Sequence, residues 1–348
     1  MGPNHSAKSD GNFFDPLRHL AALMVLFSHH FPLSGRPEPT FPGWETAGTI
    51  AVTMFFAISG FFMPQSHRSA GDYLGFMRKR CRRIFPGLVV CSFVMVYFIG
   101  ATFTKVPLFH YLFDVEQVKT FLLFASLSGR YIPTVFDDFT FKSAINGSLW
   151  TLPIEFLWYI IIGSVLSISA SWRSAAGLLW LSFIGFAILN WSGQGSLAFY
   201  GVSMIYLALF GVSFSMGALL SMTKDTWMPY RGRLVFAALL LVAVARYRPE
   251  TLIVGAGCVA VLTIIAGVSI PDRLIRERFD LSYGIYIYAF PIQQIVINCI
   301  SRNFWFSMLL AAVFTVIAAS FSYHFIEKPF LRRRAPHKPV AESVESLA

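Results

Sequence analysis

The sequence predicts an all-α polytopic membrane protein with about ten transmembrane helices and both termini in the cytoplasm. Composition, apolar segments and the placement of Lys and Arg lead to this fold class. Of the 348 residues, 55% are hydrophobic and 13% are charged, whereas about 25% are charged in a typical soluble domain. So little polar surface cannot cover a single soluble core, which excludes an ordinary soluble protein.

Ten apolar segments are long enough, or nearly long enough, to cross a bilayer. They lie near residues 15–33, 48–64, 84–103, 149–169, 174–191, 198–221, 234–247, 251–269, 281–300 and 304–326. An aromatic run at 121–127 is a candidate for an eleventh, partial insertion. We therefore expect one membrane domain over 15–329, a cytoplasmic tail over 1–14, and a basic, then disordered, cytoplasmic tail over 330–348.

The distribution of basic residues predicts the orientation of these spans. With the N-terminus in the cytoplasm, 20 Lys and Arg fall on the inside and eight on the outside. Basic residues concentrate on the cytoplasmic side of membrane proteins, so both termini are expected there. The same bias explains the net charge of +10, and no nucleic-acid partner is expected. The N-terminus lacks signal-peptide features, and the four cysteines lack the spacing of a disulfide framework or metal site.

The first span contains two ionisable side chains at helical spacing. Arg18 and His29 are eleven residues apart, which places them on the same helix face within roughly 20° and about 16 Å apart along the axis. Such residues are costly in a membrane unless they face the protein interior or a water-filled cavity. This spacing predicts a functional histidine. His30 is the alternative, because adjacent positions point about 100° apart.

Two loops differ from the others in charge or length. The loop 65–83 ends in the sequence RKRCRR, which could attract anionic lipid headgroups or bind a polyanionic cofactor at the cytoplasmic face. The outer segment 104–148 is expected to cap an outward-facing cavity.

A polar turn opens the span that contains Glu155. The segment NGSLWTLPIEF places this carboxylate one to two turns inside the membrane. One interpretation is a structural hydrogen bond to Ser148, Trp150 or a neighbouring helix. The other is an acid, a base or an orienting partner for a histidine.

These pieces, in this order, resemble the membrane acyltransferase-3 family. The segments that carry the resemblance extend from Asp15 to about Pro329 and are DPLRHLAALMVLFSHH, GTIAVTMFFAISGFF, RKRCRRIFPG, SLWTLPIEF, LSYGIYIYAFP and FIEKPF. The resemblance implies transfer of an acetyl or other short acyl group from acyl-CoA to a carbohydrate hydroxyl, as in exopolysaccharide, O-antigen or lipooligosaccharide. It also implies the bacterial inner (cytoplasmic) membrane as the location.

The resemblance assigns family motifs to particular residues. The Arg-x10-His motif falls on Arg18 and His29, the basic motif on Arg82 and Arg83, and the membrane carboxylate on Glu155. The usual glycines of the first motif are replaced by Pro16 and His19. Ala289 stands where the late motif commonly carries a histidine, which places more of the catalytic role on His29.

These assignments predict a mechanism. A hydroxyl is a poor nucleophile near pH 7, so His29 is expected to act as general base or as a transient acyl carrier. Arg18 would hold a phosphate or the pantetheine arm of acetyl-CoA, and Arg82 and Arg83 would bind its other phosphates. Glu155 would orient His29 or bind the acceptor. The expected substrate contacts are Ser148, Trp150 and Tyr283, and no metal is expected.

The expected partners are acyl-CoA, a carbohydrate or lipid-linked glycan acceptor, and membrane lipid. A homo-oligomer or a biosynthetic complex is left open. The alternative function is a transporter or flippase of a polar or lipid-linked substrate, which would use intramembrane Arg, His and Glu as a relay. No inverted repeat is visible in the sequence to support it.

Overall fold

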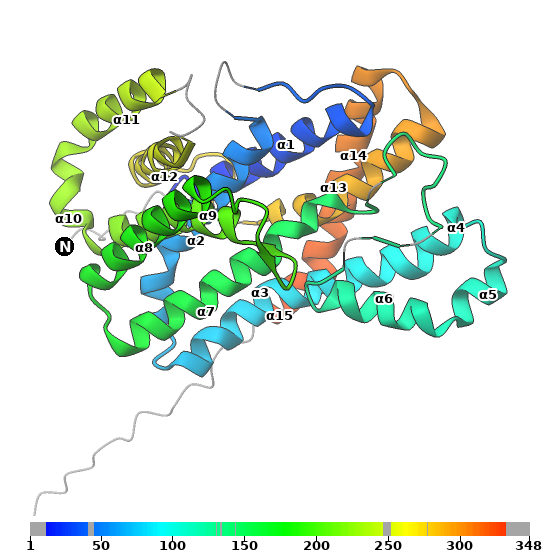
Figure 1. Ribbon diagram of the computed structural model, residues 1–348, viewed down its shortest axis with the longest axis horizontal. Coiled ribbons are helices and arrows are strands. Elements are labelled where there is room, and N and C mark those ends of the chain that lie inside the picture. The colour runs from blue at the N-terminus through cyan, green and yellow to red at the C-terminus, as the bar shows by residue number, and fades with distance from the viewer. Residues whose placement is uncertain are drawn as a thin grey trace, which may run out of the picture.

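The structure is a computed structural model that describes residues 12–40, 45–129, 131–132, 134–142, 144–245, 252–276 and 278–331. These residues form a bundle of long helices with one antiparallel hairpin, β1 (Ala198–Phe199) and β2 (Val202–Ser203) (Figure 1). The tails expected over 1–14 and 330–348 lie mostly outside the described residues.

Each of the ten predicted spans corresponds to a long helical stretch. These stretches are α1 (Phe14–Leu33), α2 (Ala47–Arg68), α3 (Tyr73–Phe93) with η1 (Val94–Gly100) and α4 (Ala101–Phe103), η2 (Gly147–Thr151) with α7 (Leu152–Ile168), α8 (Trp172–Trp191), α9 (Met204–Met222), α11 (Arg231–Ala245), α12 (Leu252–Ser269), α13 (Ser282–Ile295) with η5 (Val296–Ile300), and α14 (Phe304–Ser322) with η6 (Tyr323–Glu327) and α15 (Lys328–Leu331).

Within the described part of the chain, nine of these stretches are long and apolar enough to cross a membrane. The remaining one is α1, in which Asp15, Arg18 and three histidines interrupt the apolar sequence. Its ionisable side chains therefore require protein neighbours, which the bundle supplies. The all-α polytopic fold class is confirmed.

The segment between the third and fourth spans, which is predicted to lie on the outer side, contains two short helices, α5 (Leu108–Phe113) and α6 (Val115–Ala125). Most of the aromatic run at 121–127 forms the end of α6, and Phe121 packs against Phe93 of α3 with ring centroids 6.3 Å apart. A helix of 11 residues is only about 16 Å long. The run is therefore too short to be an eleventh complete span.

The basic segment before the third span is helical, and the prediction of a loop over 65–83 was wrong. The helix α2 continues to Arg68 and α3 begins at Tyr73. Asp72 caps α3 by accepting a hydrogen bond of 2.6 Å from the Gly75 amide. Arg, Lys and Met are good helix formers once such a cap is present. The cationic side chains are consequently arrayed along α3 and not in a flexible connection.

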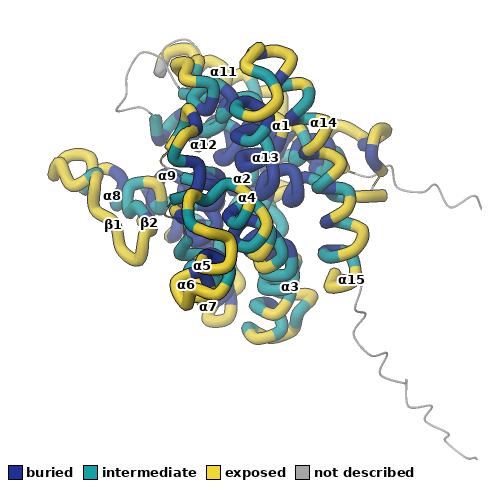
Figure 2. The backbone as a smooth tube through the Cα atoms, turned by 90° about the vertical axis from the view of Figure 1, so that its right-hand side faces the viewer, coloured by how far each residue is buried: buried dark blue, intermediate teal, exposed yellow. Residues whose placement is uncertain are grey.

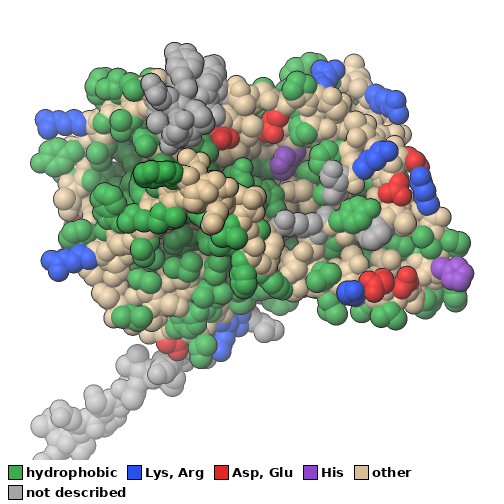
Figure 3. Space-filling view, in the orientation of Figure 1, with side chains coloured by type: hydrophobic (Ala, Val, Ile, Leu, Met, Phe, Trp, Pro, Cys, Tyr) green, Lys and Arg blue, Asp and Glu red, His purple; other side chains and the backbone are tan. Residues whose placement is uncertain are grey.

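The core of the bundle lies around α2 and α13, which form the dark centre of Figure 2. The apolar window of α13 is 72% buried and that of α2 is 67% buried, against 11% for the stretch that contains α11. The peripheral helices α8 and α11 carry exposed apolar side chains such as Trp180, Leu181 and Phe236. Hydrophobic side chains cover much of the face shown in Figure 3, as expected where lipid surrounds the protein.

Candidate active site

A cavity of about 1000 Å³ opens between α1, α2, α3, α7 and α13. Its lining on α2 extends from Ser66 to Val52, a stretch of about 21 Å at the rise of an α-helix. The cavity therefore begins at the basic end of the bundle and reaches most of the way towards the opposite end. The charge distribution predicts that the basic end is cytoplasmic.

The mouth of the cavity is strongly cationic. Six basic side chains line it, against the carboxylates of Glu155 and Asp280: Arg18, Arg78, Lys79, Arg80, Arg82 and Arg83. A cleft with an excess of one charge raises the local concentration of the opposite charge. The structure thus brings together the three arginines that the sequence assigned to donor binding, and the site suits a polyanionic ligand.

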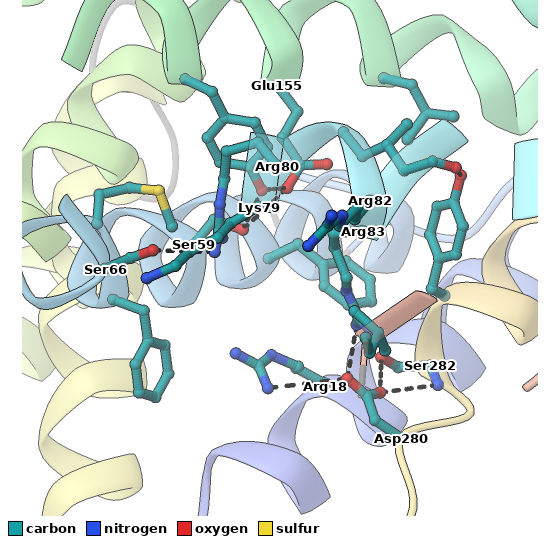
Figure 4. A pocket seen from close by; sticks show the side chains of 18 of the residues that line it. Arg18, Ser59, Ser66, Lys79, Arg80, Arg82, Arg83, Glu155, Asp280 and Ser282 are labelled. Atoms are coloured by element: carbon teal, nitrogen blue, oxygen red, sulfur yellow. Dashed lines mark hydrogen bonds and ion pairs between the residues drawn. The ribbon is translucent and has the colours of Figure 1, made fainter. Parts of the chain in front are cut away.

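Asp280 connects two of these arginines, although they come from different helices (Figure 4). Its Oδ2 atom lies 2.6 Å from an Nη atom of Arg83 and 3.9 Å from one of Arg18. Ser282 donates hydrogen bonds to the other oxygen from its amide and its hydroxyl. Burial alone would raise the pKa of Asp280, but the attraction of Arg83 and Arg18 outweighs it and holds the pKa well below its usual range.

The other cations at the mouth differ in how they are held. Arg80 donates to the Ser66 hydroxyl at 3.0 Å, and Lys79 donates to a second serine. Arg82 and Arg78 have no hydrogen bond or ion pair with another residue of the described ranges. Their charges are therefore available to a ligand.

Glu155 lies part of the way along the cavity, on the side opposite Arg18 and Asp280 (Figure 4). It accepts hydrogen bonds from the hydroxyls of Ser59, at 2.9 Å, and Tyr159. Ser59 belongs to α2, so this carboxylate joins two helices and faces the cavity. Among the described residues, its hydrogen-bond partners are these two hydroxyls. Glu155 does not contact His29, whose partner is Ser148.

Tyr286 lies at the inner end of the cavity. Its hydroxyl donates to the main-chain oxygen of Ser148 at 2.6 Å and shares a hydrogen bond of 2.5 Å with the Thr151 hydroxyl. The ring packs edge-on against Phe55, with centroids 5.8 Å apart. Phe55, Thr151 and Tyr286 all line the cavity. Together they form a wall at its inner end.

His29 lies beyond this wall and is half-buried. Its Nδ1 atom is 3.3 Å from the Ser148 hydroxyl, and its ring packs edge-on against Phe290. Ser148 therefore contacts both sides, since its main-chain oxygen binds Tyr286 and its side chain binds His29. Arg18 and His29 lie at the two ends of α1, at the cavity mouth and beyond its inner end.

His30 is fully buried and structural. Its Nε2 atom lies 3.1 Å from the Phe304 main-chain oxygen and 3.0 Å from the Ser307 hydroxyl, and Gln293 contacts its other nitrogen. These contacts join α1 to α13 and α14. Of the two histidines, only His29 has the partial exposure that a reacting group needs.

The remaining predicted contacts divide between the cavity and its surroundings. Tyr283 lines the cavity, donates to the Ile84 main-chain oxygen at 2.7 Å and lies beside Arg83. Trp150 packs edge-on against Tyr206 at 4.9 Å and is not among the residues that line the described cavity. Among the described residues, no group of three His, Cys, Asp or Glu side chains could hold a metal ion.

Sequence reasoning missed several residues of this site. Asp280, Ser59 and Thr151 meet their partners through tertiary contacts, which helical spacing does not reveal. Tyr159 lies one helical turn from Glu155 on α7, so its spacing could have indicated it. Asp280 had a weak local signal, as an acid that directly precedes an apolar span. Tyr286 was visible in its span only as one tyrosine among three.

The comparisons with known proteins identify the family. An acyltransferase domain model, acyltransferase-3, matches residues 12–324. An O-acetyl transferase of Shigella phage Sf6 is 35% identical over 333 residues, covering 93% of this chain and 97% of the relative. Nodulation protein 10 of Rhizobium leguminosarum bv. viciae is 28% identical, covering 96% of this chain and 97% of the relative.

A peptidoglycan O-acetyltransferase of Listeria monocytogenes is 25% identical, covering 90% of this chain but 55% of the relative. No solved structure matches the chain. The domain match covers nearly the whole chain, and it favours an enzyme over the transporter alternative. The chain therefore belongs to the acyltransferase-3 family and is a multi-pass membrane enzyme of the O-acetyltransferase type.

Proposed function

We propose that this enzyme transfers an acetyl group from acetyl-CoA, bound from the cytoplasm, to a hydroxyl of a carbohydrate or lipid-linked glycan on the outer side of the bacterial inner membrane. The observation that carries the proposal is the long cavity. The cavity has a cationic mouth at one end. At its inner end, Tyr286 in the wall binds the main-chain oxygen of Ser148, and the Ser148 hydroxyl contacts His29.

The mouth suits the phosphates of acetyl-CoA. Arg82 and Arg83 offer forked donors that match phosphate oxygens, and Arg18 lies across from them. A donor anchored there would extend its thioester arm inwards past Glu155 and Ser59. These two polar side chains can form hydrogen bonds with the amides of that arm. In this proposal Glu155 contacts the donor.

The acceptor would approach His29 from the other side of the wall, and its hydroxyl would meet the acetyl carbonyl at the edge of the wall, where Ser148 contacts both Tyr286 and His29. One relative is named a peptidoglycan O-acetyltransferase, which supports a glycan as the acceptor class. Trp150 and Tyr206 lie near this end of the bundle, because Trp150 is two residues from Ser148. Aromatic rings of this kind can contact the apolar face of a sugar.

The proposed chemistry is a direct acyl transfer. The Ser148 hydroxyl holds Nδ1 of His29, so Nε2 can accept the proton of the attacking hydroxyl. The acceptor oxygen forms a bond with the acetyl carbonyl carbon as the bond from that carbon to sulfur breaks. The proton passes from the imidazolium to the departing CoA thiolate, and the products are an acetyl ester and CoA.

Replacing His29 tests this proposal. His29→Ala should lower the transfer of radiolabelled acetyl from acetyl-CoA to membrane glycans by about 10²- to 10⁴-fold, the usual contribution of a general base. The KM for acetyl-CoA should change little, because the phosphates bind at the far end of the cavity. Membranes that carry Arg18→Ala should instead show a raised KM for the donor.

His30→Ala is the matched control. It removes hydrogen bonds that join three helices, so it should lower thermal stability while transfer per folded molecule is kept. Full activity in His29→Ala would refute the proposed role of that residue. Movement of a glycan across the membrane without any acetylation would refute the enzymatic proposal as a whole.

A further inference from the structure

We infer that Phe55 and Tyr286 form the floor of the donor cavity and restrict the enzyme to short acyl groups. This inference rests on the proposed function, because it assumes that the thioester end of acyl-CoA lies at the inner end of the cavity. It adds a selectivity for chain length and names the residues that set it.

The two rings approach from different helices. Phe55 comes from α2 and Tyr286 from α13, and their planes meet at 75° with centroids 5.8 Å apart. Tyr286 is only 6% exposed, and both residues line the cavity. The edge-to-face contact of two large rings leaves little room for a chain to pass between them.

The floor is held rigidly. The Tyr286 hydroxyl makes two short hydrogen bonds, to Thr151 and to the Ser148 main chain, so the side chain cannot swing aside without breaking both. Phe55 packs against the buried cluster of Ala22, Ile285 and Ala319. A long acyl chain would therefore have to displace packed side chains, which a close-packed interior resists.

The chemistry of the inner end also favours an alkyl group. Val52, Phe56 and Leu152 complete the lining beside Phe55 and Thr151. An acyl group that ends in a methyl group can pack against these side chains. An acyl group that ends in a carboxylate would lose its hydration there, because the basic side chains lie at the other end of the cavity.

The test compares donors of increasing length in membranes that contain the full chain, with the membrane glycan as acceptor. We expect kcat/KM to fall about tenfold or more for each step from acetyl- to propanoyl- to butanoyl-CoA, since one methylene against a fixed wall is worth roughly 10- to 200-fold. Phe55→Ala should lower the acetyl-to-butanoyl ratio by about tenfold or more.

Phe61→Ala is the matched control on the same helix. Phe61 packs against Phe14, with centroids 5.1 Å apart, and does not line this cavity within the described residues. The Phe61→Ala substitution also removes a phenyl ring from α2, and it should leave the acetyl-to-butanoyl ratio of kcat/KM at the wild-type value. Tyr286→Phe keeps the ring but loses both hydrogen bonds, so it should lower the acetyl-to-butanoyl ratio of kcat/KM by less than Phe55→Ala does.

The outcomes separate this inference from the proposed function. Absence of acetyl transfer by the wild-type protein would refute the proposed function. Wild-type acetyl transfer with an unchanged ratio in Phe55→Ala would overturn the inference alone. If Phe55→Ala has no transferase activity, binding is compared instead, by the increase in melting temperature of the purified protein when each acyl-CoA is added. In Phe55→Ala, the rise in melting temperature caused by butanoyl-CoA should come closer to the rise caused by acetyl-CoA than it does in the wild type. If the difference between the two rises is as large as in the wild type, the inference is overturned.

Discussion

The cationic mouth depends on one carboxylate that serves two arginines. Arg18 and Arg83 carry two positive charges, and Asp280 lies between them with one negative charge. Arg18 also pairs with Asp15, with the two side chains 3.0 Å apart, so the excess of positive charge at the mouth comes from the other basic side chains that line it, Arg78, Lys79, Arg80 and Arg82. A phosphate group of the donor can neutralise this excess, because charge-assisted hydrogen bonds to arginine are among the strongest in proteins.

Asp280→Asn should therefore affect stability and donor binding in opposite directions. Without donor, the substitution removes the ion-pair partner of Arg83 and leaves Arg18 paired with Asp15, and the melting temperature should fall. With saturating acetyl-CoA, the phosphates replace the lost charge, so the increase in melting temperature on adding donor should exceed that of the wild type. Thermal unfolding of the purified protein with and without acetyl-CoA measures both effects.

The control for this experiment is an ion pair on the surface. Lys105 and Asp138 are 2.8 Å apart and both side chains are exposed. Asp138→Asn should change the melting temperature only slightly, both with and without acetyl-CoA, since exposed ion pairs contribute little to stability. A smaller donor-induced increase in Asp280→Asn than in the wild type would show that Asp280 is not beside the bound phosphates.

The histidine pair shows what sequence alone could settle at the scale of residues. The spacing of Arg18 and His29 placed both on one helix, and the structure has them at the two ends of α1. The choice between His29 and His30 required tertiary contacts. Ser307 and Phe304, which hold His30, are more than 270 residues away in the chain.

Among the helices, the contact of α2 with α9 limits how the cavity wall can move. A Cβ atom on Gly217 would lie 2.1 Å from the Ala57 main-chain oxygen, and one on Gly60 would lie 1.9 Å from that of Phe214. Small residues permit such close approach of membrane helices. The helix that carries Phe55 and Ser59 is consequently packed tightly on the side away from the cavity.

Gly217→Ala should destabilise the protein by about 1–3 kcal/mol, as overpacking of a close contact usually does. The added methyl group must push α2 and α9 apart, because the atom it meets belongs to the main chain. Thermal unfolding in detergent measures the effect. Gly177→Ala on α8 is the matched control, since a Cβ there meets no atom within 4 Å, and an equal loss in both variants would contradict this account.

The third span illustrates the limit of prediction for whole elements. Apolar run length located all ten long helical stretches, nine of which are apolar enough to cross a membrane within the described residues, but it missed the first part of α3, whose residues are largely basic. A hydropathy pattern responds to the part of a helix that lies in lipid. The polar part extends the same hydrogen-bonded structure beyond the membrane core, supported by the Asp72 cap.

For the molecule as a whole, orientation in the membrane is the prediction that matters most for function. The basic mouth of the cavity must face the cytoplasm if acyl-CoA is the donor. Lys119, on α6, and Lys224, on α10 (Lys224–Trp227), are both exposed and are predicted to lie on opposite sides of the membrane.

Single cysteines test this orientation. In a variant without the four native cysteines, an impermeant maleimide applied to intact inner-membrane spheroplasts should label Lys119→Cys and should label Lys224→Cys only after permeabilisation. Labelling of both after denaturation is the control for reactivity. The reverse pattern would contradict the predicted orientation and the entry of the donor at the basic mouth.

The sequence by itself determined the class of the protein, the positions of its spans and its predicted orientation. These properties follow from local composition, because apolar length and flanking charge act on each segment separately. It also indicated which ionisable residues to examine, among them Arg18, His29 and Glu155.

Only the tertiary structure decided which of these residues meet. Asp280 pairs with Arg83 across 197 positions, and Tyr286 reaches Ser148 across 138. Contacts at such separations depend on how helices pack, which helical spacing within one segment cannot specify. The cavity and its aromatic floor are therefore products of packing, while the helices that build them are products of composition.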